Sequence, residues 1–134
     1  ETHEIQMLNK HPDDKKQTMV FYPRIKVIQP GDSVVFKATT KGHNSVSVKG
    51  MIPEGAEPWK SKFNKDHEVT LTEPGFYGYV CVPHTQMGMI GLIIVEGEGK
   101  LNNLDAARAV KHRGRAQKHW DALWAQAEAD GLLA

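Results

Sequence analysis

Residues 75–95 have the sequence GFYGYVCVPHTQMGMIGLIIV, in which a short loop rich in sulfur separates two apolar runs. Each run has the length and the aromatic or β-branched content of a β-strand, so we expect strands at Phe76–Val80 and Ile90–Val95. Because side chains alternate along a strand, the two tyrosines and Cys81, at odd positions, share one face. We therefore expect Cys81 to be buried on an apolar face.

Similar short runs recur between proline and glycine turns through the first hundred residues. Turn signals such as Pro30-Gly31-Asp32 stand directly before a run. Further strands are expected at Glu4–Leu8, Arg24–Ile28, Ser33–Ala38, Ser45–Val48 and Glu68–Thr72. Many short strands at this spacing predict a mainly β fold, a Greek-key β-sandwich.

After residue 98 the composition shifts to alanine, leucine and basic residues, which favours helices. Asn103 is placed to cap a short helix that ends near Val110. A second helix after Gly114, expected to end at Gly131, has an apolar stripe of period 3.6. The stripe consists of Ala116, Trp120, Leu123, Trp124 and Ala127. We expect it to pack on the sandwich, so that residues 1–134 form a single domain with a sandwich (1–98) and a helical extension (99–134).

Length and composition exclude several classes of protein. The 134 residues carry a formal net charge of +1, without the basic excess of a nucleic-acid-binding protein. The longest apolar run, Met89–Val95, is far shorter than the roughly 20 residues of a membrane helix, so no membrane insertion is expected. The first residues lack the pattern of a signal peptide, so the chain is either intracellular or the mature form of an exported protein.

The single cysteine stands in a Cys81-x2-His84-x4-Met89 loop that also contains Met87. Soft sulfur ligands combined with imidazole select copper, especially Cu(I), over magnesium or calcium. Two histidines and one cysteine in a trigonal set, with a long axial methionine, form the blue-copper geometry. The loop supplies only one histidine, so this chemistry requires a second one from elsewhere.

His43 is the best candidate for the second histidine, because it follows a predicted strand where the end loops of a sandwich meet. The other histidines stand among polar residues without a sulfur partner, and we expect them to be solvated at the surface. They are His3, His11, His67, His112 and His119. The residues thus predict a copper site of His43, Cys81, His84 and a methionine of the loop.

Other interpretations of this loop are weaker. A structural zinc site uses four cysteine or histidine ligands, usually with paired cysteines, and the chain has one cysteine. A cysteine protease needs a third group that orients its histidine and an oxyanion element, and neither is evident. Taken singly, Cys81 would be a buried structural cysteine and the methionines would fill the core.

The chain resembles the cupredoxin family, and within it the pseudoazurins, over nearly its whole length. The resemblance lies in IQMLNK, IQPGDSVVF, KGHNSVSVKGMIPEGAE, PGFYGYVCVPH and MGMIGLIIV, and in the two-helix extension that begins at NNLDAA. It implies a cupredoxin-like Greek-key β-sandwich with two C-terminal α-helices. It also implies one copper ion, cycling between Cu(II) and Cu(I), on the ligands His43, Cys81, His84 and Met89.

The resemblance assigns roles to several neighbouring residues. Met87 is implied to lie nearer the surface than the axial ligand, and the edge of His84 to reach solvent. The backbone of Asn44 is implied to donate a hydrogen bond to the Cys81 sulfur, and Asn44 also helps to tie the two ligand loops. Met19 matches a methionine that packs near the exposed histidine ring.

The implied function is single-electron transfer by a monomeric type 1 copper protein, an electron carrier and not an enzyme. Pseudoazurins typically donate electrons to periplasmic denitrification enzymes, especially copper nitrite reductase, so the periplasm is the expected location. An excess of lysine over acidic residues in segment 37–65 favours an acidic partner. We expect it to dock around His84 on Lys10, Lys41, Lys49, Lys60 and Lys62, although a solvated lysine face accounts for these charges equally well.

Departures from the family pattern concern docking and not the ligands. The 11–18 loop is longer and more charged than expected, Val80 replaces a common lysine, and Pro58-Trp59 replaces a more basic pair. The alternative function is copper storage or delivery, but delivery sites tend to be open, whereas a buried cysteine favours retention. An oxidoreductase would need a second metal site or a substrate pocket, which the scattered remaining histidines do not supply.

Overall fold

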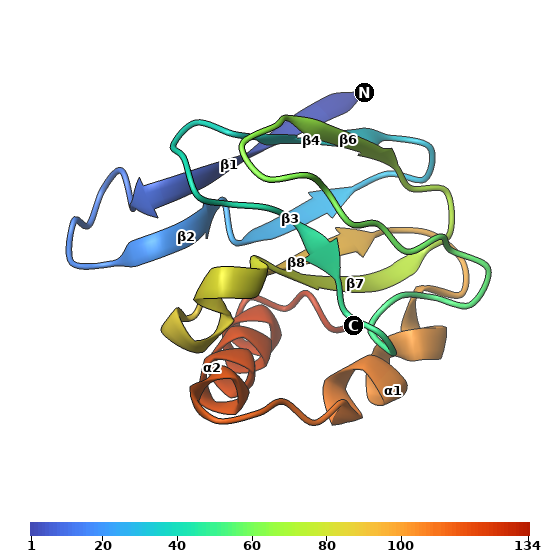
Figure 1. Cartoon of the computed structure of the whole chain (residues 1–134). Coiled ribbons are helices and arrows are strands. Elements are labelled where there is room, and N and C mark those ends of the chain that lie inside the picture. Colours follow the sequence, from blue (N-terminus) through green and yellow to red (C-terminus); the bar gives the residue numbers. More distant parts are fainter.

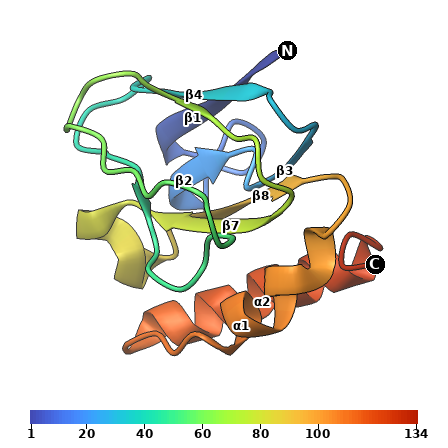
Figure 2. The same cartoon turned by 90° about the vertical axis from the view of Figure 1, so that its right-hand side faces the viewer.

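The computed structural model describes all 134 residues and shows two β-sheets packed face to face, with helices against the outer face of one sheet (Figures 1 and 2). In spatial order, the first sheet contains β2 (Thr18–Tyr22), β1 (Thr2–Lys10), β4 (Ser33–Lys37) and β6 (His67–Thr70). The second contains β3 (Ile25–Ile28), β8 (Ile90–Val95), β7 (Gly75–Val80) and β5 (Val46–Ser47). The predicted mainly β sandwich with two C-terminal helices is confirmed.

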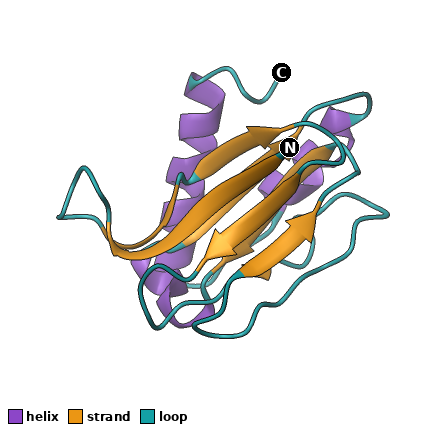
Figure 3. Cartoon of the chain, turned by 90° about the horizontal axis from the view of Figure 1, so that it is seen from above, coloured by secondary structure: helices purple, strands orange, loops and turns teal.

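Each sheet contains one parallel pair of strands among antiparallel neighbours. β1 runs parallel to β4, with Ile5 opposite Phe36, and β3 runs parallel to β8. The remaining pairs are antiparallel, including β7 with β8, where Tyr77 lies opposite Ile93. Seen from above, the strands of the two sheets run roughly along one another, with α2 behind them (Figure 3).

The main core fills the space between the sheets. Its buried members are Ile5, Met7, Phe21, Ile28, Val34, Phe36, Trp59, Leu71, Tyr77, Tyr79, Cys81, Met89, Ile93 and Val95. The Tyr79 ring lies near the middle, 4.8 Å from Phe21 and 5.0 Å from Phe36 between ring centroids. The predicted alternation therefore holds, because the odd residues of β7 point inward and Phe76 belongs to the opposite face.

A second apolar cluster covers the outer face of β7 and β8. It is completed by α1 (Leu104–Ala109) and α2 (Arg115–Ala129), which follow the short 3₁₀ helix η2 (Lys100–Asn103). Trp124 of α2 packs on Phe76 at 5.9 Å between ring centroids, and Trp120 is also buried there. The predicted stripe on α2 therefore packs against the sandwich. No helix of the structure combines the length and the hydropathy that crossing a membrane requires.

The end of α2 and the start of α1 agree with the prediction, but the capping bond expected from the side chain of Asn103 is absent. Gly131 has a φ of 74°, and the amide of Leu132 donates to the carbonyl of Ala127 at 2.9 Å, so a left-handed glycine ends the helix. Asn103 precedes α1, but its side chain makes no capping bond. Instead it accepts from the amide of Phe76 at 2.9 Å and donates to that residue's carbonyl at 2.8 Å, joining the extension to β7.

Strand β2 is an element that the sequence did not predict. Two adjacent residues of β2, Val20 and Phe21, are both buried, which hides the alternation expected of a strand. Phe21 belongs to the core, whereas Val20 faces a groove beside α2. Met19 also has a positive φ of 55°, which interrupts the extended backbone.

Candidate metal centre

The Cys81–Met89 loop joins β7 to β8 at one end of the sandwich. Cys81 follows β7 directly, the short 3₁₀ helix η1 (Val82–Met87) carries His84, and Met89 precedes β8. The amide of Cys81 donates to the carbonyl of Met89 at 3.0 Å, and the amide of Met89 donates to the carbonyl of His84 at 3.1 Å. These backbone hydrogen bonds fold the loop back on itself. The side chains of Cys81, His84 and Met89 are therefore held at one end of the core.

Three predicted ligand residues meet at this end. The Cys81 sulfur lies 3.7 Å from Nδ1 of His43 and 3.4 Å from Nδ1 of His84. The three donor atoms lie within 4.8 Å of one another. A first-row metal bound at about 2.0–2.3 Å from nitrogen and sulfur, with near-trigonal angles, would separate such donors by about 3.5–3.8 Å. The two sulfur–nitrogen distances, 3.7 Å and 3.4 Å, lie close to these values.

The two methionines of the loop differ sharply in burial. Met89 is fully buried in the same core cluster as Cys81, whereas the side chain of Met87 is 51% exposed. Of the two thioethers, only that of Met89 is enclosed with the thiol. This agrees with the placement of Met87 nearer the surface.

His43 is oriented by a residue that the sequence analysis did not identify. The ring is only 1% exposed, and its Nε2 lies 2.7 Å from the side-chain oxygen of Asn9. Because that oxygen can only accept, Nε2 carries the proton, and the lone pair of Nδ1 faces Cys81. Burial lowers the pKa of His43, and the neighbouring His84 lowers it further, so the neutral form that can bind a metal is favoured.

Cys81 is a buried free thiol. Burial raises the pKa of Cys81, while backbone hydrogen bonds from Asn44 and His84 act in the opposite direction. The side-chain oxygen of Asn44 also accepts from the amide of Val82 at 3.0 Å, which ties the two ligand loops together. Both interactions expected of Asn44 are therefore present. A buried thiolate becomes favourable when a soft cation supplies the compensating charge.

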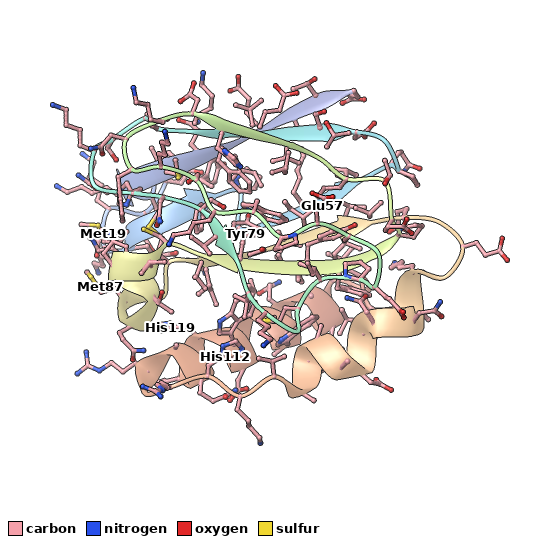
Figure 4. The ribbon with its side chains drawn as sticks, turned by 45° about the vertical axis from the view of Figure 1, so that its right-hand side comes forward. Met19, Glu57, Tyr79, Met87, His112 and His119 are labelled. Carbon is pink, nitrogen blue, oxygen red and sulfur yellow. The ribbon has the colours of Figure 1, made fainter.

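One edge of the cluster reaches the surface. His84 is partly exposed, and beside it on η1 the side chains of Val82 and Met87 are 54% and 51% exposed. Met19 lies at the same end of the molecule as Met87 (Figure 4). Val82, His84 and Met87 thus form an exposed, largely apolar patch at the edge of the cluster.

The lysines differ in their relation to this patch. Lys37 forms an ion pair with Asp66 at 2.7 Å, so its charge is offset. Lys41 precedes the His43 loop, and Lys60 pairs with Val46 at the start of β5. Beyond β5 the chain runs away from the cluster, because the amide of Val48 bonds to Gly78, three residues before Cys81. Lys49 therefore lies farther from the metal end.

The five remaining histidines are not solvated in the way the sequence analysis expected. Each of them is partly buried. His3 bonds to Asp32 at 2.9 Å, and His112 stacks on Trp120 at 4.9 Å between ring centroids. The ring of His119 packs against Gly88 so closely that a Cβ there would lie 2.7 Å from it. None of the five belongs to the metal cluster, in line with the choice of His43.

Comparison with known proteins identifies the family. Residues 8–96 match the family of copper binding proteins described as the plastocyanin/azurin family. A pseudoazurin from Paracoccus pantotrophus is 45% identical over 125 residues, which is 93% of this chain and 83% of that protein. A solved pseudoazurin structure from Sinorhizobium has a TM-score of 0.86 at 43% identity, covering 96% of this chain and 97% of that one.

A second structure, that of pseudoazurin from Methylobacterium extorquens AM1, has a TM-score of 0.83 at 40% identity and covers 94% of this chain and 98% of that one. The match thus includes the helical extension as well as the sandwich. Together with the convergence of His43, Cys81 and His84, these findings show that the chain belongs to the pseudoazurins of the plastocyanin/azurin family, and that it is a type 1 copper electron-transfer protein and not an enzyme.

Proposed function

We propose that His43, Cys81, His84 and Met89 hold the copper ion, and that the protein carries single electrons to an acidic redox partner in the bacterial periplasm. The observation that supports the ligand set is the approach of two imidazole Nδ1 atoms to one buried sulfur, at 3.7 Å and 3.4 Å. Met89 completes the set because it is the enclosed thioether of the loop. Two histidines, a cysteine and a weak axial methionine form the blue-copper arrangement.

The bound copper supplies one-electron chemistry by alternating between Cu(II) and Cu(I). The chain keeps the donors in one arrangement. Asn9 fixes the ring of His43, Asn44 joins the two ligand loops, and the hydroxyl of Thr85 donates to the carbonyl of Cys81 at 2.8 Å. A donor set held in this way rearranges little between the two redox states, which favours rapid electron transfer.

The partly exposed ring of His84 provides the exit for the electron. It lies among the exposed apolar side chains of Val82 and Met87, which allow close, largely dry contact with a partner. We propose copper nitrite reductase as the partner, docking on Lys10, Lys41, Lys60 and Lys62 around this patch. Lys49, which the sequence analysis included, contributes less because it follows β5 away from the cluster.

Copper storage or delivery is the rival function, and it predicts an accessible site that releases metal. His43 and Cys81 are 1% and 0% exposed, which supports retention. A competition experiment with a modest copper chelator separates the two functions. A carrier keeps its copper over the time of many electron self-exchange events, whereas a delivery protein loses copper quickly and exchanges electrons slowly.

The ligand set is tested by optical and EPR spectra of the copper-loaded protein. We expect intense visible thiolate-to-copper charge transfer that is nearly abolished in Cys81→Ser and strongly altered in His43→Ala. His67→Ala, in β6 and outside the cluster, is the matched control and should leave the spectrum unchanged. An unchanged spectrum in His43→Ala would refute this ligand set.

A further inference from the structure

A groove separate from the metal cluster lies between α2, the corner that joins β2 to β3, and the end of η1. Its volume is about 610 Å³, within the roughly 300–1,000 Å³ typical of sites for small molecules. Its apolar lining includes Val20, Ile25, Ile90 and Leu123. The same groove is lined by Lys16, Arg24 and His119, and it contains no acidic residue.

Arg24 is the residue that points to a ligand. Its Nε is buried without a hydrogen-bond partner, and its only side-chain hydrogen bond runs from Nη2 to the side-chain oxygen of Gln17 at 3.2 Å. None of the ion pairs in the structure involves Arg24. Arginines with little solvent contact are normally paired with a carboxylate, because an isolated desolvated charge is unfavourable.

No neighbour within the chain supplies the missing negative charge. Burial lowers the pKa of Arg24 itself, and the nearby Tyr79 only partly opposes this. Burial also raises the pKa of Tyr79, so its hydroxyl stays neutral. The backbone of Arg24 is fixed at the sheet, because its carbonyl accepts from the amide of Leu92 at 2.9 Å. Arg24 therefore lines the groove without a carboxylate partner from the chain.

We propose that this groove binds a small organic anion that consists of a carboxylate head and an apolar chain. The head pairs with Arg24, flanked by Lys16 and His119, and the chain lies along Val20, Ile90 and Leu123. A purely inorganic anion would leave that apolar lining exposed to water. In Figure 4 the side chain of His119, a residue of α2, lies on the side of the helix that faces the turn carrying Met87. Met87 and Gly88 also line the groove, so a bound ligand touches the end of the metal loop.

Binding is tested on the reduced, copper-loaded protein, because Cu(I) is diamagnetic and permits NMR of the whole chain. Octanoate is titrated against the ¹⁵N-labelled protein, with octanamide as the uncharged analogue and acetate as the head alone. We expect saturable shifts at the amides of Gly88, His119 and Leu123. Octanamide should bind about tenfold more weakly or worse, because it cannot form a charge-assisted pair with Arg24.

Two pairs of variants locate the site. Arg24→Gln should weaken octanoate binding about tenfold, whereas Lys26→Gln, with the same charge change outside the groove, should alter it less than about twofold. Ala122→Glu places a competing carboxylate at the groove and should also block binding, whereas Ala125→Glu, exposed on α2 outside the groove, should not. Both alanine positions are exposed, so these variants should fold.

Three results would overturn the proposal. They are an absence of saturable shifts up to the solubility limit of octanoate, equal binding of octanoate and octanamide, and undiminished binding to Arg24→Gln. Shifts at the groove that arise only with an acidic protein partner would also overturn it, because the groove would then belong to a docking surface. The result does not depend on which residues hold the copper.

Discussion

The side-chain oxygen of Asn9 lies 2.7 Å from Nε2 of His43, although the two residues are 34 positions apart. Asn9 belongs to β1, whose parallel pairing with β4 brings it to the loop that carries His43. The backbone amide of Asn9 also donates a hydrogen bond to the hydroxyl of Thr40 at 2.9 Å, which further joins β1 to the loop that carries His43. The orientation of this proposed ligand is therefore set by β1, a strand of the sheet opposite the one that carries the Cys81 loop.

Replacing Asn9 with alanine should weaken copper retention without removing a ligand. The ring of His43 would lose the hydrogen bond that fixes its proton on Nε2, and loss of such a partner typically lowers metal affinity about 10–100-fold. The measurement is the rate of copper transfer to a chelator. Asn102→Ala, exposed on η2 and away from the cluster, is the control. Equal rates in the two variants would contradict the role assigned to Asn9.

The two methionines of the loop should respond differently to the same change. Met89→Leu keeps the volume but removes the thioether enclosed with Cys81, so both the ratio of the visible absorption bands and the reduction potential should change. Met87→Leu alters an exposed side chain and should leave both quantities near the wild-type values. If Met87→Leu gives the larger change, Met89 is not the axial ligand.

The sequence predicted the part of this site that depends on local spacing. Cys81, His84 and the two methionines lie in one loop, and the alternation along β7 showed which way Cys81 points. His43 could be inferred because few histidines stand at the end of a predicted strand. Asn9 could not, because its contact depends on a parallel pairing between β1 and β4 that no local pattern encodes.

The errors in the fold prediction have similar causes. β2 was missed because its two adjacent buried residues face different surroundings, the core for Phe21 and a groove for Val20. Asn103 was expected to cap α1 with its side chain. Its side-chain amide instead forms two hydrogen bonds with the backbone of Phe76, which is distant in the sequence. The remaining histidines were expected in solvent, and tertiary partners such as Asp32 partly bury them.

The stability of the metal-free protein should fall in acid partly because of Asp32. A side-chain hydrogen bond with His3, and then the amide of Gln29, hold the pKa of Asp32 well below its ordinary value. A lowered folded-state pKa gives stability that is complete above the unfolded value of about 3.9 and is lost as the pH falls below it. Asp32→Asn should therefore reduce the free energy of unfolding more at pH 6 than at pH 3.

Urea unfolding of the wild-type protein and the variant at these two pH values provides the measurement. Asp13→Asn is the control, because Asp13 is exposed in the 11–18 loop. Its effect should be small at both pH values. If Asp32→Asn lowers the free energy of unfolding by the same amount at pH 6 and at pH 3, the hydrogen bonds of Asp32 do not depend on its charge.

Charge reversal should distinguish lysines that guide a partner from lysines that are merely solvated. Lys41→Glu and Lys60→Glu change charges near the metal end, so each should slow electron transfer to an acidic partner, by about tenfold at low salt, and flatten its salt dependence. Lys49→Glu makes the same change beyond β5 and should have a much smaller effect. The measurement is the second-order rate constant with copper nitrite reductase across a salt series.

All three variants carry the same change of charge. Comparing them therefore separates the effect of a lysine's position on the rate from the effect of the protein's net charge. If the three rate constants fall equally, the effect comes from the overall charge of the protein, and no docking surface around His84 is needed to explain it. If Lys41→Glu and Lys60→Glu leave the rate and its salt dependence unchanged, the partner does not approach through this face. Only slowing at Lys41 and Lys60, with Lys49 near the wild-type rate, supports an approach over Val82, His84 and Met87.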